Sequence, residues 1–291
     1  MAVVVLATCA AYPEPKTDAP LRDALAARGH EVLSAPWNGE QSPFERADLV
    51  VLRACWDYHE NPAAFLNWLD ELEARRVQLL NEYGLVRWNF DKRYLAALHA
   101  AGVPCVPTIK VDAQDESEAR ARMRALEWQR AVRKPVHGQS GYGVELLSLD
   151  EAWSAPSYNG PALLQPFQAD ISELGETLLV YLEGKFSHAI RRELPAGEWR
   201  SNARFGARRV AAEVSDAVVR SGVEILERGL AVAGTFADVD EVPLYARVDG
   251  LVRDDALVLM ELELIEPALG FEVAPEGAVR MAAAIDARLA L

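Results

Sequence analysis

A chain of 291 residues with 51% hydrophobic and 25% charged side chains has the composition of a globular protein of about two or three packed lobes. Its formal net charge of −14 argues against an extended nucleic-acid or anionic-membrane surface, because such surfaces need clustered Lys and Arg. The sequence contains no signal-peptide pattern, long uncharged run or CxxC pair, which favours a cytoplasmic protein with reduced cysteines.

The first third of the chain predicts a small domain with a parallel sheet. One helix begins near Asp18 and Pro20 and ends at Gly29, and a second begins at Asn61. Strands that alternate with helices form a parallel sheet covered on both sides, so residues 1–85 are expected to be an α/β domain. The predicted strands are Val3–Thr8, Glu31–Ala35 and Asp48–Arg53.

Two segments of this domain follow strands, at the edge where parallel sheets bind ligands. They are Cys9–Asp18 and Arg53–Tyr58. The second segment places a cation, an acid and two aromatic side chains at one strand end. A purely structural alternative is that the aromatic side chains pack in the core and Arg53 pairs with Asp57.

Beyond residue 85 the pattern changes to mainly β-structure. A helix is expected at Asp91–Ala101, a polar helix at Asp112–Arg124 and a long helix at Ser215–Ala233, and a last helix ends the chain. The turn-like segment Asp249–Asp255 separates the last two strands. The predicted strands are Val106–Val111, Ala131–Pro135, Gly143–Leu147, Ala162–Phe167, Thr177–Leu182, Lys185–Arg191, Val242–Val248 and Ala256–Glu263.

The strongest local motif is a lysine at a strand end followed by a glycine-rich loop. Lys134 precedes Gly138, Gly141 and Gly143, and a strand follows. Glycines allow backbone N–H groups to approach phosphate oxygens, and the lysine supplies a charge to the same anion. The spacing fits neither the P-loop nor the Rossmann fingerprint. A plain turn is the structural alternative.

Acidic side chains alternate on the last two strands. Residues two apart share a face of a strand, so Glu261 and Glu263 point the same way, as do Arg247 and Asp249. If these strands are neighbours, three carboxylates and one guanidinium converge. Such carboxylates repel one another unless a cation lies among them, and Mg²⁺ commonly bridges carboxylates to phosphates. An acidic strand edge with a surface salt bridge is the alternative.

Three further segments carry weaker signals. Lys92 lies at the start of a helix, where it binds an anion or is simply solvated. Gln165 and Phe167 lie on a strand whose amide and backbone groups could bind adenine. Arg192, and Arg200 in the loop that follows, are basic groups that bind an anion or are surface charge.

In order and approximate spacing, these segments resemble the ATP-grasp superfamily over roughly residues 85–270. The family pattern is a lysine before the small lobe, a lysine with a Gly-rich loop, an adenine hinge, and a late Arg-x-Asp with an acid pair. The resemblance implies an α/β (α+β) protein in which a parallel-sheet domain precedes a two-lobed ATP-grasp fold. The expected domains are 1–85, 86–165 with the Gly-rich loop, and 166–291 with the metal site.

The resemblance also implies the cofactors, ATP and Mg²⁺, with two ions expected, and a role for each matching residue. Glu263 departs from the pattern, because Asn is frequent at that metal position, and the extra charge should favour two tightly held ions. The implied ATP-binding residues are Lys92, Lys134, Ser140, Gly141, Gln165, Phe167 and Glu173. The implied metal ligands are Asp249, Glu261 and Glu263, and the implied catalytic residues are Arg247, Arg192 and Arg200.

Residues 53–73 and 86–108 resemble the glutathione-synthetase-like and ribosomal-modification-ligase-like branch. That branch is similar to the cyclo-ligases that convert O-ureido-D-serine to D-cycloserine. The resemblance implies an ATP-dependent carbon–nitrogen ligase with a small amino-acid-like substrate, and a homo-oligomer is possible. Alternatives are an intermolecular amino-acid ligase and a nucleotide-binding regulator without turnover. The substrate-domain candidates are Asp18, Arg53, Trp56, Asp57 and Tyr58, of which either aspartate could bind an ammonium group.

Overall fold

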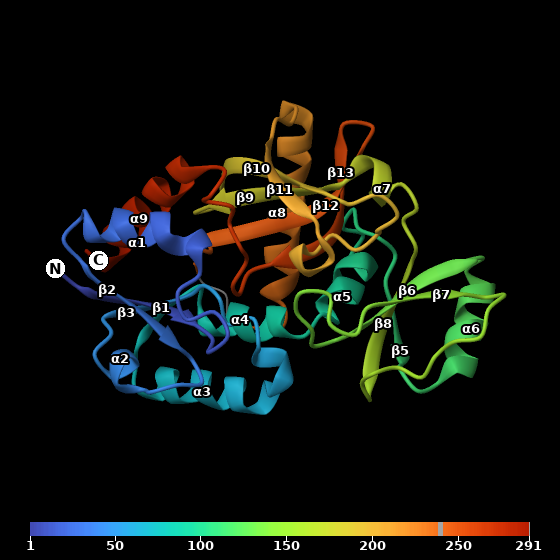
Figure 1. Ribbon diagram of the computed structural model, residues 1–291, viewed down its shortest axis with the longest axis horizontal. Helices are drawn as coiled ribbons and strands as arrows, with labels where there is room; N and C mark the ends of the chain where they lie inside the picture. Colours follow the sequence, from blue (N-terminus) through green and yellow to red (C-terminus); the bar gives the residue numbers. More distant parts are fainter. Residues whose placement is uncertain (238–240, 291) are drawn as a thin grey trace.

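The N-terminal sheet is parallel, as the alternation of strands and helices predicted. The computed structural model describes residues 1–237 and 241–290, and Figure 1 shows this sheet beside two further sheets. Its strand order is β2-β1-β3-β4. The strands are β1 (Val3–Thr8), β2 (Glu31–Pro36), β3 (Leu49–Leu52) and β4 (Gln78–Leu80).

Both faces of this sheet are covered because alternate residues of each strand enter different cores. Val4 and Leu6 of β1 pack in one cluster with α1 (Ala19–Ala26), whereas Val5 and Ala7 pack in another with α3 (Pro62–Ala74). The short helix α2 (Ser42–Glu45) lies on the side of α3. Asn61 caps α3 by accepting from Ala64 N, as its position before Pro62 predicted.

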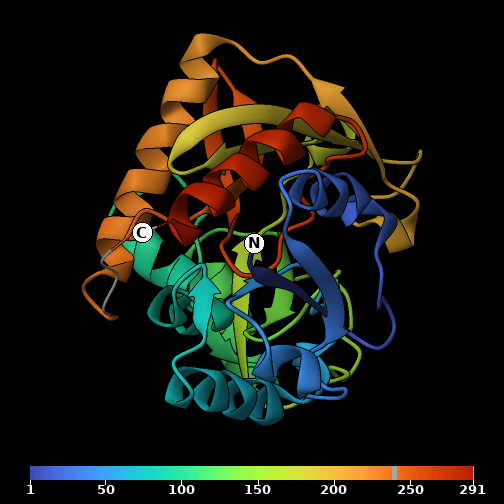
Figure 2. The same ribbon diagram turned by 90° about the vertical axis from the view of Figure 1, so that its left-hand side faces the viewer.

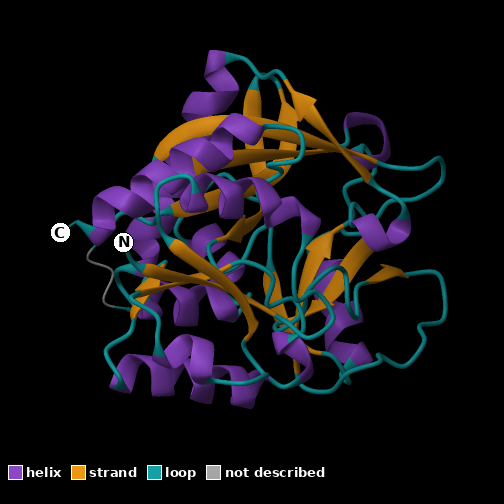
Figure 3. Cartoon of the chain, turned by 60° about the vertical axis from the view of Figure 1, so that its left-hand side comes forward, coloured by secondary structure: helices purple, strands orange, loops and turns teal. Residues whose placement is uncertain are grey.

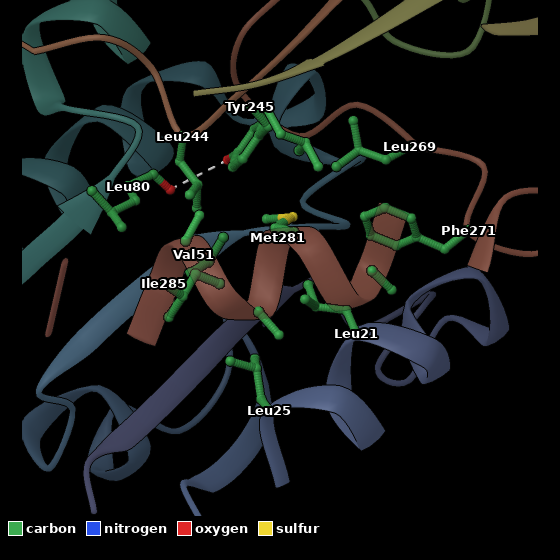
Figure 4. Packing of buried hydrophobic residues seen from close by; sticks show 14 of the residues in the cluster. Leu21, Leu25, Val51, Leu80, Leu244, Tyr245, Leu269, Phe271, Met281 and Ile285 are labelled. Carbon is green, nitrogen blue, oxygen red and sulfur yellow. Dashed lines mark hydrogen bonds between the residues drawn. The ribbon is translucent and has the colours of Figure 1, made fainter. Parts of the chain in front are cut away.

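The last helix, α9 (Pro275–Leu289), returns to the N-terminal domain and lies beside α1 (Figure 2). Met281 and Ile285 of α9 are fully buried against Leu21 and Leu25 of α1 (Figure 4). Truncating such a side chain to alanine costs roughly 2–5 kcal/mol. The two chain ends therefore lie on the same side of the molecule (Figure 3), and the first domain is completed by the end of the chain.

The small lobe is a four-stranded antiparallel sheet of order β5-β8-β6-β7. The helix α6 (Glu116–Ala125) packs on it, with Met123 fully buried in the lobe's own core. Two short helices, α4 (Tyr83–Phe90) and α5 (Tyr94–Ala100), precede the lobe. The strands are β5 (Ile109–Asp112), β6 (Arg130–Pro135), β7 (Glu145–Ser148) and β8 (Pro161–Pro166).

The large lobe is a five-stranded antiparallel sheet of order β11-β10-β9-β12-β13. The long helix α8 (Asp216–Ala233) packs on one face, with Ile225 and Leu226 in its core, and α9 packs on the other. The short helix α7 (Ile171–Leu174) precedes the sheet. Its strands are β9 (Glu176–Leu182), β10 (Lys185–Glu193), β11 (Arg208–Ala212), β12 (Tyr245–Arg253) and β13 (Ala256–Glu263).

The structure corrects several of the predicted element boundaries: the helix expected from Asp112 begins at Glu116, and the strands expected from Val106 and Val242 begin at Ile109 and Tyr245. The helix expected from Asp91 begins at Tyr94, because a separate helix, α4, ends at Phe90. The segment Asp249–Asp255 is not a turn as a whole, since β12 continues to Arg253. Within this segment only Asp254 and Asp255 have left-handed φ angles, of 49° and 58°, and these two residues form the hairpin turn between β12 and β13.

The fold class is confirmed. Each of the three sheets is formed by strands from one of the expected domain ranges, except that β8 ends at Pro166, one residue beyond the range 86–165. The division into domains stays a prediction. Within the described residues the cysteines are free, and Cys9 and Cys55 are buried. No helix in the described part of the chain is long and apolar enough to cross a membrane.

Candidate active site

A cleft between the small and large lobes collects most of the residues predicted to bind ATP. The strand β6 and its Gly-rich loop form one wall, β8 and the segment after it form the hinge, and β13 forms the opposite wall. The predicted residues that line the cleft are Lys92, Lys134, Ser140, Gly141, Gln165, Phe167, Arg192, Arg200, Glu261 and Glu263. The sequence patterns therefore located one shared cavity.

Two lysines mark one end of the cleft. Lys134 lies near the end of β6, and no carboxylate of the described residues lies within ion-pair distance of it. Burial, together with the nearby Lys92, lowers the pKa of Lys134 to about 7. Lys92 itself is paired with Glu261, and burial lowers the pKa of Lys92 despite several nearby carboxylates. An anion that enters the cleft would meet a lysine with a free ammonium.

The Gly-rich loop contacts the other two parts of the protein. Gly141 has a φ of 76°, and a Cβ there would lie 2.7 Å from Asn202 Oδ1 of the large lobe. On its other side the loop meets the N-terminal domain: Gln139 donates a hydrogen bond to Tyr58 Oη, and the Tyr142 ring lies 4.8 Å from that of His59. The loop therefore covers the cleft.

The hinge is built by the end of β8. Gln165 is buried and donates to Thr108 Oγ1 at 2.8 Å. The Arg130 guanidinium lies over the Phe167 ring, with Cζ 4.4 Å from the ring centroid. The same ring forms an edge contact with Trp199. Glu173, predicted to lie near the ribose, is exposed on α7 and is not among the residues that line the cleft.

The predicted acidic cluster lies on neighbouring strands. In the β12–β13 pairing, Arg247 is opposite Glu263 and Asp249 is opposite Glu261. Arg247 is 1% exposed, and it donates two hydrogen bonds of 2.8 Å to Asp249 and approaches Glu263 at 2.7 Å. Burial opposes the charge, but these carboxylates raise the pKa of Arg247 above its usual range. Arg247 therefore lies behind the cleft wall and neutralises it.

The acidic side chains suit Mg²⁺ as partners of a bound phosphate. Within residues 1–237 and 241–290, no three His, Cys, Asp or Glu side chains are gathered into a ready-made metal site. Mg²⁺ usually binds one or two carboxylates together with substrate phosphates, so no complete protein cage is required. Glu261 and Glu263 both line the cleft and offer oxygen ligands of the kind this ion prefers.

One cleft residue was missed by the sequence analysis. Glu176, at the start of β9, is 5% exposed, accepts 2.6 Å and 2.5 Å hydrogen bonds from Arg192 Nη1 and Ser201 Oγ, and lines the cleft. It thereby orients Arg192, whose Nη1 also lies 3.7 Å from Asp249. An acid at the start of a strand that continues with the apolar run Leu178–Leu182 was the available signal. Arg200 pairs with Glu198.

The substrate-domain candidates of the N-terminal domain all contact other groups of the protein. Arg53 pairs with Asp18 at 2.9 Å inside the protein, so the alternative pairing with Asp57 is wrong. Asp57 accepts hydrogen bonds from Trp37 Nε1 at 2.6 Å and from Asn38 Nδ2 at 3.0 Å. Tyr58 is buried and stacks on Phe65, as the structural alternative for the aromatic side chains expected. Trp56 donates to the backbone oxygen of Glu266 at 3.1 Å.

A smaller polar pocket connects this domain with the cleft. It shares four lining residues with the cleft, namely Lys92, Gln139, Glu261 and Glu263. The pocket is also lined by Tyr58 of the N-terminal domain and by Glu266, to which the sequence analysis gave no role. A substrate group in this pocket would lie beside Glu261, which is paired with Lys92, and Glu263, which is paired with Arg247. The remaining lining residues are Asn89, Tyr94, Leu262 and Ile265.

Comparison with known proteins identifies the family. A profile of the N-terminal domain of D-cycloserine synthetase DcsG matches residues 4–81. The cycloserine biosynthesis protein DcsG of Streptomyces lavendulae is 31% identical over 293 residues, which covers 93% of both chains. The crystal structure of D-cycloserine synthetase DcsG superposes with a TM-score of 0.83 at 27% identity and 99% coverage of both chains.

Two more distant structures share the fold alone. D-alanine–D-alanine ligase from Bacillus anthracis has a TM-score of 0.70 at 14% identity, covering 99% of this chain and 97% of that one. The ATP-grasp ligase PsnB, complexed with minimal precursor, Mg and ADP, has a TM-score of 0.61 at 18% identity, covering 99% and 97%. The sequence identity to DcsG places the chain in the DcsG family, which shares its fold with these two ligases.

Proposed function

We propose that this ATP-dependent ligase activates a carboxyl-like group of a small amino-acid-type substrate as an acyl phosphate, which nitrogen then attacks. The likeness to DcsG supports D-cycloserine as the product, formed by cyclisation of O-ureido-D-serine. One observation carries the proposal: Lys92 and Lys134 from the front half of the chain and Glu261 and Glu263 from the back half line one cleft. That cleft can hold a nucleotide triphosphate and a divalent cation together.

The cleft residues have distinct roles in binding ATP. Lys134, with its unpaired ammonium, and Lys92 bind the phosphates, and the backbone N–H groups around Ser140 and Gly141 cover them. The adenine lies against the hinge formed by Gln165 and Phe167. Arg192 and Arg200 at the cleft wall hold the γ-phosphate or the substrate carboxylate.

The reaction is driven mainly by positioning and charge stabilisation. A substrate carboxylate oxygen attacks the γ-phosphorus and ADP leaves; nitrogen then attacks the carbonyl carbon, loses a proton and expels phosphate. In the cyclising reaction that nitrogen belongs to the same molecule, and its carbamoyl group is lost by hydrolysis. Arg247, behind Glu263, stabilises the charge of the wall, and closure of the Gly-rich loop keeps water from the acyl phosphate.

Asp249, Glu261 and Glu263 would hold the metal, and we propose two Mg²⁺ ions. When bound, the ions would neutralise the phosphate charge during transfer. Before binding, Glu261 is paired with Lys92, and Asp249 and Glu263 are paired with Arg247, so the nucleotide and its cations would exchange these pairings.

Release of ADP tests the proposal directly. Purified protein with Mg²⁺ and ATP should release ADP when O-ureido-D-serine is the only added substrate, and mass spectrometry should detect D-cycloserine. A requirement for a second amino acid would support the intermolecular ligase instead, a reaction of the kind named for the D-alanine–D-alanine ligase neighbour. No ADP with any amino acid or ureido compound would leave only a nucleotide-binding regulator. Cytoplasmic location and a homo-oligomeric state stay predictions, which cell fractionation and light scattering test.

A further inference from the structure

The pocket beside the cleft contains one carboxyl group that the protein does not use. Glu266 is 4% exposed and lines this pocket, yet its side chain forms no hydrogen bond or ion pair with any described residue. A buried carboxyl normally has partners, because burying an unpaired charge is costly. Glu266 is therefore a candidate for binding a ligand.

The other polar side chains of the pocket are already engaged. Asn89 and Tyr94 bond to the backbone of β13, and Tyr58 bonds to Gln139. The charged ones are paired too: Lys92 with Glu261, and Glu263 with Arg247. Among the described lining residues, Glu266 is the acidic one whose carboxyl has no protein partner, so both of its oxygens can accept hydrogen bonds from a ligand.

The backbone that carries Glu266 is held in place on both sides. Four consecutive carbonyl oxygens, from Ile265 to Ala268, each accept a hydrogen bond from a side chain, with distances between 2.6 Å and 3.1 Å. The donors are Tyr245, Trp56, Arg53 and Arg247, in that order. A group held this firmly before binding loses little freedom when a ligand arrives. Arg53 and Trp56, predicted to touch substrate, thus act on Glu266 through its backbone.

We propose that Glu266 binds the ammonium group of the amino-acid-type substrate. This inference rests on the proposed function, because it places the ammonium end of the substrate in this pocket and the rest of the substrate in the adjoining cleft. The two aspartates considered for this role are engaged elsewhere. Asp57 accepts from Trp37 and Asn38, and Asp18 is neutralised by Arg53 and lines a separate pocket that shares no residue with the cleft.

The electrostatic surroundings suit a cationic ligand. Burial raises the pKa of Glu266 well above its usual range and Glu263 raises it further, whereas Lys92, Arg247 and Arg53 lower it. An ammonium group would supply this carboxyl with a partner that carries a positive charge and three hydrogen-bond donors. It also offsets the excess of acidic groups at the pocket, where Glu261 and Glu263 are the neighbouring carboxylates.

The test compares two substrates in matched variants. ADP release is measured with O-ureido-D-serine and with its analogue that has a hydroxyl in place of the α-amino group. Glu266→Gln, which keeps the shape and removes the charge, is compared with Glu227→Gln on the exposed face of α8. We expect Glu266→Gln to raise KM for the amine roughly 10- to 100-fold, with KM for the hydroxyl analogue and for ATP unchanged. Glu227→Gln should leave all three values as in the wild type.

Several results would overturn the inference. One is a Glu266→Gln variant that prefers the amine as strongly as the wild type, and another is a loss of kcat with unchanged KM, which indicates a proton-transfer role. A change confined to the Mg²⁺ dependence would make Glu266 a metal ligand instead. If Glu266→Gln does not fold, the same two substrates are compared in Glu266→Asp and in the wild type. A wild-type protein that uses both substrates equally has no ammonium site, and this result would overturn the inference.

The failure of this inference can be told from failure of the proposed function. Absence of ADP release by the wild-type protein with O-ureido-D-serine refutes the function. Normal ADP release by the wild type, combined with undiminished preference for the amine in Glu266→Gln, refutes the role of Glu266 alone.

Discussion

The affinity for ATP should depend on pH through one residue, Lys134. Burial in the cleft wall, next to Lys92, lowers its pKa to about 7, so the ammonium is mostly lost by pH 8 in the free enzyme. Bound phosphates favour the charged form, so the complex takes up a proton when ATP binds. Affinity is then highest below pH 7 and falls as the pH rises through that value.

The size of the effect follows from the pKa. If Lys134 stays charged in the complex, the apparent Kd is inversely proportional to the fraction of free enzyme in which Lys134 is already protonated. Between pH 6 and pH 8 this fraction changes about tenfold, which corresponds to about 1.4 kcal/mol. A lysine at its usual pKa would produce no change over the same range.

Calorimetric titration with saturating Mg²⁺ and no second substrate measures this dependence. Lys134→Met is the matched control, because it keeps every other titrating group of the cleft and also His137, which lies near Lys92. We expect the variant to bind more weakly at pH 6 and to show a much flatter profile. Identical pH profiles of wild type and variant would refute the assignment of the phosphate-binding charge to Lys134, as would an unchanged Kd in the variant at pH 6.

Three further changes test other parts of the site. Glu263→Gln should reduce ADP release at least about 100-fold while the unfolding midpoint stays close to that of the wild type, and normal ADP release would contradict the metal assignment. Asp18→Ala leaves Arg53 buried without its carboxylate and should lower the free energy of unfolding by roughly 3–5 kcal/mol in urea titration; a loss below about 1 kcal/mol would show that Arg53 finds another partner. Gly141→Ala should raise KM for ATP several-fold, because the loop there has a φ of 76° and lies against the large lobe, whereas Gly160→Ala, with a φ of 89° and nothing within 4 Å, carries backbone strain alone and should leave KM unchanged. Equal effects of the two glycine variants on KM would refute the role of the loop contact.

Local patterns in the sequence determined most of the elements and the order of the motifs, although β4 and β11 were not predicted. Apolar runs in β1 and β3 predicted a buried parallel sheet, because strands covered on both faces carry few polar residues. Alternation predicted that Arg247 and Asp249 share a face of β12 and that Glu261 and Glu263 share a face of β13, and the register of the two strands sets these pairs opposite each other. Such inferences succeed because backbone periodicity is decided by residues close together in the chain.

Only the tertiary structure decided which side chains meet. The pairing of Arg53 with Asp18 rather than Asp57 depends on how the segment before α1 packs over the sheet, and the place of α9 beside α1 brings together residues more than 250 positions apart. The isolation of Glu266 is likewise invisible in the sequence, since it depends on Asn89, Tyr94 and Lys92 being satisfied by other partners. Burial and pairing are properties of distant segments packed together, and these properties set the charge and the availability of each group in the site.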